Sequence, residues 1–203
     1  MQQDLSDNPA ALLSSFLAVT EKEIYQLLKQ SVSEGNLPFA AAIFAKQDLE
    51  PLQVSVNKVK DSPLLHGETN CIREFFALPK ATRPAPDRCV FFATHEPCSL
   101  CLSGISWTGF PLIYYLFTYE DTRDMLGIGG DIDILEEVFR VPAPCDSQDS
   151  LIARPLYNKS NRFFTAKSVS ELLAEIKDPV ERAKWEEEVK RVRSLLEEFK
   201  SNN

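Results

Sequence analysis

Two cysteines at C-x-x-C spacing, Cys98 and Cys101, follow a proline in the stretch "THEPCSLC" and make up half of a metal site. A structural zinc site needs four protein ligands, whereas a catalytic site uses three and keeps one position open. The whole chain contains only two histidines, His66 and His95. The fold must therefore either close the site locally through His95 or bring a distant residue to the cysteine pair.

His95 is the local candidate for a third ligand. It lies at the predicted end of a strand and is separated from Cys98 by Pro97, so its side-chain direction is hard to reconcile with the cysteine pair. Strand ends in open α/β sheets line binding sites. We therefore interpret His95 as a pocket-wall or hydrogen-bonding residue that contributes to substrate binding, and not as a ligand.

His66 begins the tripeptide "HGE", which places Glu68 two residues after it, and it precedes Cys98 by 32 positions. Taken with the later "PCSLC", these residues match H-x-E…P-C-x-x-C, the signature of zinc nucleobase deaminases. The interval leaves room for one helix, a loop and one strand. Both ligand groups would then lie at helix N-termini, where exposed N–H groups and the helix dipole favour a thiolate.

Hydrophobic spacing predicts alternating helices and strands. Helices are expected over 21–35, 66–78 and 98–109 and from about Asp131, with Thr20 and Glu23 as a capping box for the first. Strands are expected over 37–46, 52–59, 88–96 and 112–120. Such alternation indicates an α/β sheet covered on both faces.

The C-terminal segment is predicted to form two helices, one from about Ser168 and one that begins at Asp178–Pro179. Apolar residues spaced four and three apart give the second helix one seam: Trp185, Val189, Val192, Leu196 and Phe199. An extension of this length must bury its seam on the parent domain or on a partner subunit. We accordingly divide the chain into a domain with N-terminal helices over 1–150 and a C-terminal segment over 151–203.

The charge of the chain argues against a nucleic-acid partner, because a net charge of −8 and a pI of about 4.9 repel polyanions. No stretch approaches the roughly 20 apolar residues of a membrane span. The apolar run over 9–19 lacks the basic start of a signal peptide. The five cysteines form no secreted-type framework, so we expect a cytoplasmic protein with no membrane association.

On these motifs the chain resembles the cytidine and deoxycytidylate deaminase superfamily over about residues 35–119. The stretches "EGNLPFAAAIF", "HGE", "EPCSLC" and "LSGISWTGFP" are similar to family landmarks. A histidine as first ligand resembles the cytosine, guanine, deoxycytidylate and tRNA-adenosine deaminase branches, and Gly67 is similar to fungal-type cytosine deaminases. The resemblance implies a three-layer α-β-α fold with a mixed central sheet, to which the C-terminal helices are an extension.

The resemblance also implies roles for individual residues. Zn²⁺ would bind His66, Cys98 and Cys101, with water as the fourth ligand, and Glu68 would be the catalytic acid and base. Asn57, at the end of the second predicted strand, resembles the asparagine that hydrogen-bonds the base in several branches, although it is also a typical turn residue. Trp107 is a candidate for stacking on a planar substrate, or else a core residue.

The favoured function is hydrolytic deamination of a small aminated nucleobase or nucleoside, cytosine-like in type, with release of ammonia through a zinc-bound hydroxide. Alternatives are a guanine or other purine-type substrate, a tRNA adenosine, or a non-catalytic zinc module. Family resemblance suggests a homodimer. The polar and aromatic segment "PLYNKSNRFF", residues 155–164, would cover this chain's own site, cover a neighbour's site, or simply cross the surface.

Overall fold

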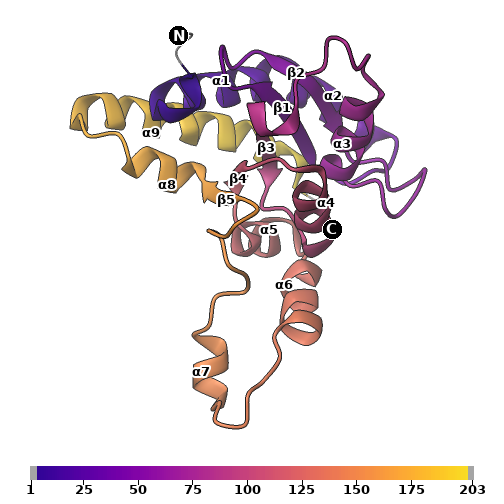
Figure 1. The fold of residues 1–203 in the computed structure, drawn as a ribbon, viewed down its shortest axis with the longest axis vertical. Coiled ribbons are helices and arrows are strands. Elements are labelled where there is room, and N and C mark those ends of the chain that lie inside the picture. Colours follow the sequence, from indigo (N-terminus) through magenta and orange to yellow (C-terminus); the bar gives the residue numbers. More distant parts are fainter. Residues whose placement is uncertain (1–3, 201–203) are drawn as a thin grey trace.

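A mixed five-stranded sheet lies at the centre of the computed structural model, which describes residues 4–200 (Figure 1). Its strands are β1 (Ala40–Ala45), β2 (Pro51–Val56), β3 (Cys89–His95), β4 (Leu112–Phe117) and β5 (Thr165–Ser168), in the order β2-β1-β3-β4-β5. Strand β1 is antiparallel to both of its neighbours, whereas β3, β4 and β5 run parallel. The four strands predicted from apolar runs are all present.

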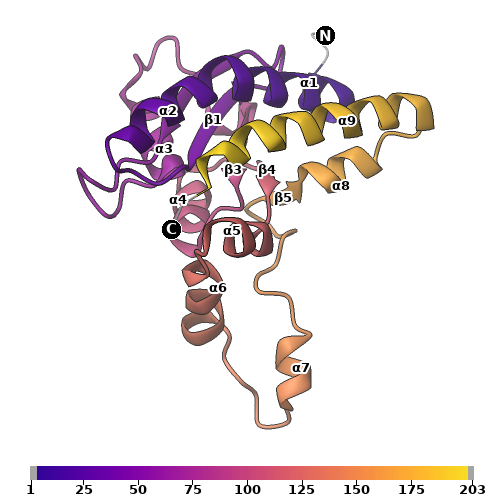
Figure 2. The same cartoon turned by 180° about the vertical axis from the view of Figure 1, so that it is seen from behind.

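Helices cover both faces of this sheet. Helices α3 (Gly67–Ala77) and α4 (Ser99–Thr108) bury one face around Phe75, Phe91 and Ile105. The other face is covered by α1 (Pro9–Val19), α2 (Tyr25–Ser33), α8 (Val169–Ala174) and α9 (Pro179–Leu196) (Figure 2). The central strands β1 and β3 are buried along their whole length, which explains their continuous apolar sequences. The expected three-layer α-β-α fold is confirmed.

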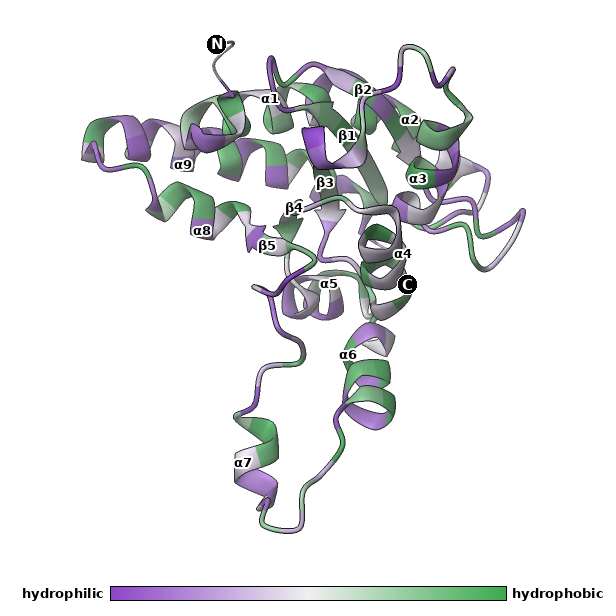
Figure 3. Cartoon of the chain, in the orientation of Figure 1, coloured by the Kyte–Doolittle hydropathy of each residue, from purple (hydrophilic) through white to green (hydrophobic). Residues whose placement is uncertain are grey.

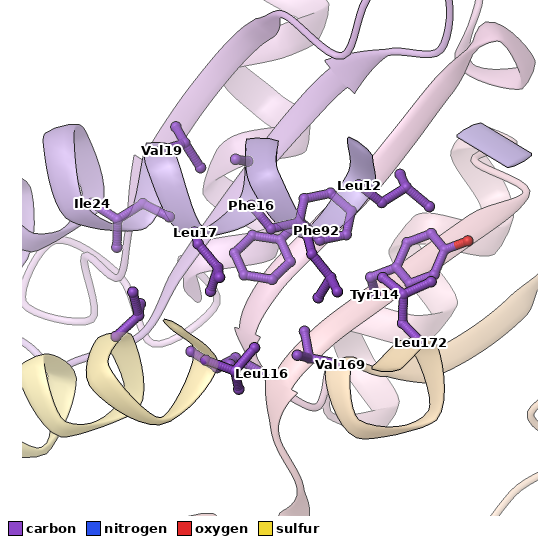
Figure 4. Packing of buried hydrophobic residues seen from close by; sticks show 14 of the residues in the cluster. Leu12, Phe16, Leu17, Val19, Ile24, Phe92, Tyr114, Leu116, Val169 and Leu172 are labelled. Carbon is purple, nitrogen blue, oxygen red and sulfur yellow. The ribbon is translucent and has the colours of Figure 1, made fainter. Parts of the chain in front are cut away.

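The N-terminal helical region begins earlier than predicted. Helix α1 is capped by Asn8, whose side chain accepts hydrogen bonds from Ala10 N and Ala11 N, and a π-helical turn (Thr20–Ile24) joins α1 to α2. The capping box predicted at Thr20 is wrong, because the Thr20 hydroxyl donates to Phe16 O inside a continuous helix. The apolar run of α1 is core: Phe16 stacks on Phe92 of β3 at a centroid distance of 4.6 Å (Figure 4).

The C-terminal segment joins the same sheet and the same core. Ser168 caps α8 and Asp178 caps α9, as predicted from sequence. The seam of α9 packs on the parent domain: Val189, Val192 and Leu196 are buried with the core residues of α1 and β4. Strand β5 was not predicted, and it extends the sheet by pairing with β4. The proposed division at residue 150 stays a prediction.

One part of the chain extends away from the sheet. After α5 (Tyr119–Leu126), helix α6 (Gly130–Ile134), a π-helical turn (Leu135–Phe139) and α7 (Gln148–Ile152) form an arm that projects from the layered body (Figure 1). Short 3-10 turns occupy Leu5–Asp7, Pro86–Arg88 and Glu197–Phe199. Over residues 4–200, no helix combines the length and the apolarity that crossing a membrane requires.

Candidate functional site

The predicted ligands lie where two helices begin. His66 is the N-cap residue of α3, and Cys98 is the N-cap residue of α4, with Cys101 in the first turn. Both caps have extended backbone angles, as helix caps usually do. The start of α3 also packs tightly against β1: a Cβ atom on Gly67 would lie 2.9 Å from Ala40 Cα and 3.0 Å from Phe39 O. Glycine at position 67 thus lets the "HGE" turn approach the sheet.

The three candidate donor atoms form a compact triangle. Cys98 Sγ lies 3.4 Å from His66 Nδ1 and 3.4 Å from Cys101 Sγ, and Cys101 Sγ lies 3.7 Å from His66 Nδ1. With Zn–S bonds of about 2.3 Å and Zn–N bonds of about 2.0 Å, neighbouring donors on a tetrahedral zinc ion are roughly 3.5 to 3.8 Å apart. Two thiolates and one imidazole are also ligands that zinc prefers. The residues present therefore fit a zinc ion with one coordination position left over.

The two thiols share a hydrogen bond that separates their acidities. The contact between the two sulfur atoms is the main cause that lowers the pKa of Cys98, and His66 lowers that pKa further. The same contact, followed by burial, raises the pKa of Cys101. One thiolate is thus already favoured without a metal, and a cation at the centre of the triangle would favour the second.

Glu68 lies in the first turn of α3 and is only 7% exposed. Burial raises the pKa of its carboxyl to about 7, and the negative charge of Cys98 raises it in the same direction. A carboxyl group with a pKa close to neutrality can both accept and donate a proton at physiological pH. Burial of a carboxylate has a large free-energy cost unless the group is paired, and carboxyl groups whose pKa is shifted by burial cluster at functional sites.

Asp131, at the start of α6, is an acidic group that the sequence motifs do not assign to the site. Burial raises the pKa of its carboxyl to about 6; Cys98 raises it further, and His66 lowers it. The Asp131 carboxyl therefore interacts electrostatically with Cys98 and His66. A glycine-rich stretch, "GIGG", precedes Asp131, and no local pattern links this residue to ligands thirty or more positions earlier.

His95 is buried at the end of β3, apart from the ligand triangle. Its ring stacks on Phe117 and meets Phe39 edge-on, with centroid distances of 4.9 and 4.7 Å. Burial lowers its pKa to about 3, so the ring is neutral. The Thr94 hydroxyl donates to Ala40 O, so His95 Nδ1 donates to Thr94 Oγ1 at 3.0 Å. Its Nε2 atom has no hydrogen-bond partner among the described residues.

Asn57 directly follows β2 and is fully buried. Its Oδ1 atom accepts hydrogen bonds from Val59 N at 3.1 Å and from Leu37 N at 3.4 Å, which is the turn role considered for it. Its Nδ2 atom has no partner within the part of the chain that the structure describes. Asn57 thus stabilises the turn through its oxygen and keeps a buried donor available, and its substrate role stays a prediction.

Trp107 lies near the end of α4, about 9 Å along the helix axis from Cys101 at 1.5 Å per residue. Its side chain is 91% exposed, so Trp107 is not a core residue. It lines a groove of about 780 Å³ together with Phe139 of the arm and Phe163 of the 155–164 segment. The structure does not bring Trp107 to the ligand cluster, and its role in substrate binding stays a prediction.

Comparisons with known proteins agree with this geometry. Residues 19–117, just under half of the chain, match the family described as the cytidine and deoxycytidylate deaminase zinc-binding region. A curated relative, a probable cytosine deaminase of Schizosaccharomyces pombe, is 28% identical over 89 residues, which are 43% of this chain and 52% of the relative. The match therefore spans about half the length of that relative.

The similar solved structures are more distant in sequence than the curated relative. The crystal structure of NE0047 in complex with 2,6-diaminopurine has a TM-score of 0.52 and 18% identity, covering 96% of this chain and 82% of NE0047. A guanine deaminase from Nitrosomonas europaea has a TM-score of 0.48 and 16% identity, covering 88% of this chain and 92% of that one. At this level of identity, the structural likeness concerns the fold alone.

Proposed function

We propose that this protein is a zinc-dependent hydrolase that removes an exocyclic amine from a small nucleobase or nucleoside, because residues 19–117 match the family described as the cytidine and deoxycytidylate deaminase zinc-binding region. The observation that carries the proposal is Glu68, a buried carboxyl with a pKa of about 7 beside a three-ligand metal site. A purely structural zinc site fills all four positions with protein ligands and has no use for such a carboxyl. The donor set and Glu68 together favour an enzyme over a non-catalytic zinc module.

His66, Cys98 and Cys101 would hold the zinc ion. When bound there, zinc supplies Lewis acidity that lowers the pKa of water toward neutrality. Glu68 accepts a proton from the attacking water and delivers it to a ring nitrogen as oxygen adds to the amino-bearing carbon. It then moves the remaining hydroxyl proton to the amine, the C–N bond breaks, and ammonia leaves a ring that now carries a carbonyl group.

The donors and acceptors near the site suit a planar, aminated ring. Asn57 Nδ2, a buried donor, would bind a ring carbonyl or nitrogen, and the Asp131 carboxyl would accept a hydrogen bond from an amino group. A cytosine-like substrate is favoured because the curated relative is described as a probable cytosine deaminase. A guanine-type base is the alternative, because NE0047, which shares the fold, is described with a bound diaminopurine. The net charge of −8 disfavours tRNA.

We also propose a homodimer in the cytoplasm, where a reducing environment would keep the five free cysteines as thiols. The groove beside α4 exposes Trp107, Phe139 and Phe163, and the arm exposes further apolar side chains, Val138, Val141 and Ile152. Figure 3 colours parts of the ribbon of α6 and α7 in this arm as hydrophobic. Exposed apolar side chains that share one groove, as Trp107, Phe139 and Phe163 do, favour association with another surface. Light scattering should give twice the chain mass, and Trp107→Asp should give a monomer. A wild-type protein that is monomeric at micromolar concentration would exclude the dimer.

The deaminase proposal is tested by an ammonia-release screen over cytosine, guanine, adenine, their nucleosides and related aminated heterocycles. Wild type and Glu68→Gln should contain equal zinc, and only wild type should release ammonia from a screened substrate. Glu187→Gln, an exposed position on α9, is the matched control and should behave as wild type. A folded, zinc-replete wild-type protein that is inactive across the panel would favour the non-catalytic module.

A further inference from the structure

Glu96 is a buried carboxylate for which the proposed chemistry has no use. It lies between His95 and Pro97, two residues before Cys98, and its side chain is only 3% exposed. A carboxylate in such a position is strongly destabilising unless hydrogen bonds and a counter-charge compensate for lost hydration. Its partners therefore show which parts of the fold depend on it.

Those partners come from two segments that follow Glu96 in sequence by more than twenty residues. Glu96 Oε1 accepts a hydrogen bond from Tyr157 Oη at 2.7 Å and forms an ion pair with Lys159 Nζ at 3.2 Å. Glu96 Oε2 accepts from the backbone N–H of Tyr119, the first residue of α5, at 3.3 Å. Both carboxylate oxygens are thus bound, and one of them is held by the 155–164 segment.

Two further hydrogen bonds hold Pro97 and Lys159 in place. Tyr119 Oη donates to the carbonyl oxygen of Pro97 at 2.5 Å, which fixes the peptide that joins Pro97 to Cys98. Lys159 Nζ also donates to Tyr115 Oη of β4 at 2.5 Å, so the lysine is held from both sides. Residues 96–97 are consequently bound on one side by Tyr119 of α5 and on the other by the 155–164 segment. They lead directly into Cys98, the N-cap residue of α4.

We infer that Tyr157 and Lys159 are positioning residues for the metal centre, acting through Glu96 on the backbone that aims Cys98. The 155–164 segment connects the projecting arm to β5, and it contacts Glu96 in the loop of the same chain that precedes Cys98. Without these contacts, the loop before Cys98 would lose the hydrogen bond from Tyr157 and the ion pair with Lys159, and only its contacts with α5 would remain. The segment is therefore a fixed part of the site and not an ordinary surface crossing.

Residues that orient metal ligands without touching the metal typically change metal affinity or activity by about 10- to 100-fold when they are replaced. We expect Tyr157→Phe to weaken Zn²⁺ binding by about 10-fold, because it removes one of several contacts to Glu96. Lys159→Met should have a larger effect, because Glu96 loses its counter-charge. Lys159→Arg should restore most of the affinity, since it preserves the charge.

The test is a chelator competition that measures zinc affinity, with the absorption spectrum of the Co²⁺-substituted protein as a report on thiolate geometry. The matched control is Tyr25→Phe, which also removes a 2.7 Å tyrosine–glutamate hydrogen bond, here to Glu198 and far from the loop. Weaker zinc binding and an altered cobalt spectrum in Tyr157→Phe and Lys159→Met, but not in Tyr25→Phe, support the inference. Variants that lose thermal stability while zinc affinity and the cobalt spectrum stay at wild-type values overturn it.

This inference rests on the proposed ligand set but not on turnover, so the two can fail separately. A protein that binds zinc through Cys98 and is inactive on every amine would refute the deaminase proposal and leave the positioning role intact. Conversely, full activity and unchanged zinc affinity in the folded Tyr157→Phe and Lys159→Met variants would refute the positioning role alone.

Discussion

The neutral histidine inside the core should make the stability of this protein sensitive to acid. His95 is enclosed by Phe39 and Phe117, and burial lowers its pKa from 6.5 to about 3. Among its neighbours, Asp121 opposes this shift and Arg193 adds to it. In the unfolded chain, the ring takes up a proton below pH 6.5, whereas in the folded protein it stays neutral until about pH 3.

The sign and size of the effect follow from linkage. A depressed histidine pKa in the folded state contributes nothing to stability above pH 6.5 and destabilises the folded protein progressively as the pH falls from 6.5 toward 3, because only the unfolded chain binds the proton. At pH 5 the unfolded histidine is 1.5 pH units below its own pKa, which corresponds to about 2 kcal/mol at 1.36 kcal/mol per unit. At pH 7.5 the contribution is close to zero. The loss between these two pH values is therefore about 2 kcal/mol.

The assay is urea unfolding of wild type and His95→Phe, metal-free and under reducing conditions, at pH 7.5 and pH 5. Phenylalanine preserves the aromatic stacking, and its loss of the Thr94 hydrogen bond is independent of pH. The variant should lose about 2 kcal/mol less than wild type between the two pH values, since all other titrating groups are common to both proteins. Equal losses in both would refute the assignment of His95 as a buried, neutral ring.

Three further outcomes concern the site. Metal analysis should give about one zinc per chain, and Cys98→Ser should reduce it because an alcohol is a poor zinc ligand; unchanged zinc would remove Cys98 from the ligand set. Gly67→Ala should lower the free energy of unfolding by about 1 to 3 kcal/mol and reduce zinc content, because the added methyl group would collide with the backbone of β1. A variant as stable as wild type would contradict that packing. Asn57→Asp should keep the turn, because the turn uses the side-chain oxygen. It should raise KM by about 10-fold, equivalent to about 1.4 kcal/mol, and an unchanged KM would show that Nδ2 does not contact the substrate.

Local sequence patterns predicted the parts of the fold that local physics determines. The apolar runs of β1 and β3 identified buried strands, and the caps Ser168 and Asp178 identified the starts of α8 and α9. The motif spacing predicted the meeting of His66 with the cysteine pair, because one helix, one loop and one strand fit between them. The observed triangle of donor atoms has the size that this pattern requires.

Features that depend on tertiary contacts were missed. The polar "TEKE" run suggested a new helix start at Thr20, but burial of Phe16 and Ile24 on the same core keeps the helix continuous. Strand β5 has only four residues, which is too short for a reliable alternation, and pairing with β4 defines it. Glu96 is separated in sequence from Tyr157 and Lys159 by about sixty residues, and no pattern within either segment predicts that they are in contact.

The catalytic role of Glu68 is measured by ammonia release from zinc-loaded wild type and from Glu68→Gln. Both proteins are assayed on the same panel of aminated bases and nucleosides, and zinc is quantified in both samples. The buried Glu68 carboxyl should be needed for proton transfer and not for metal binding. We predict equal zinc in the two proteins and a loss of turnover of about 10²- to 10⁴-fold in the variant. Turnover at the wild-type rate in Glu68→Gln would contradict the account.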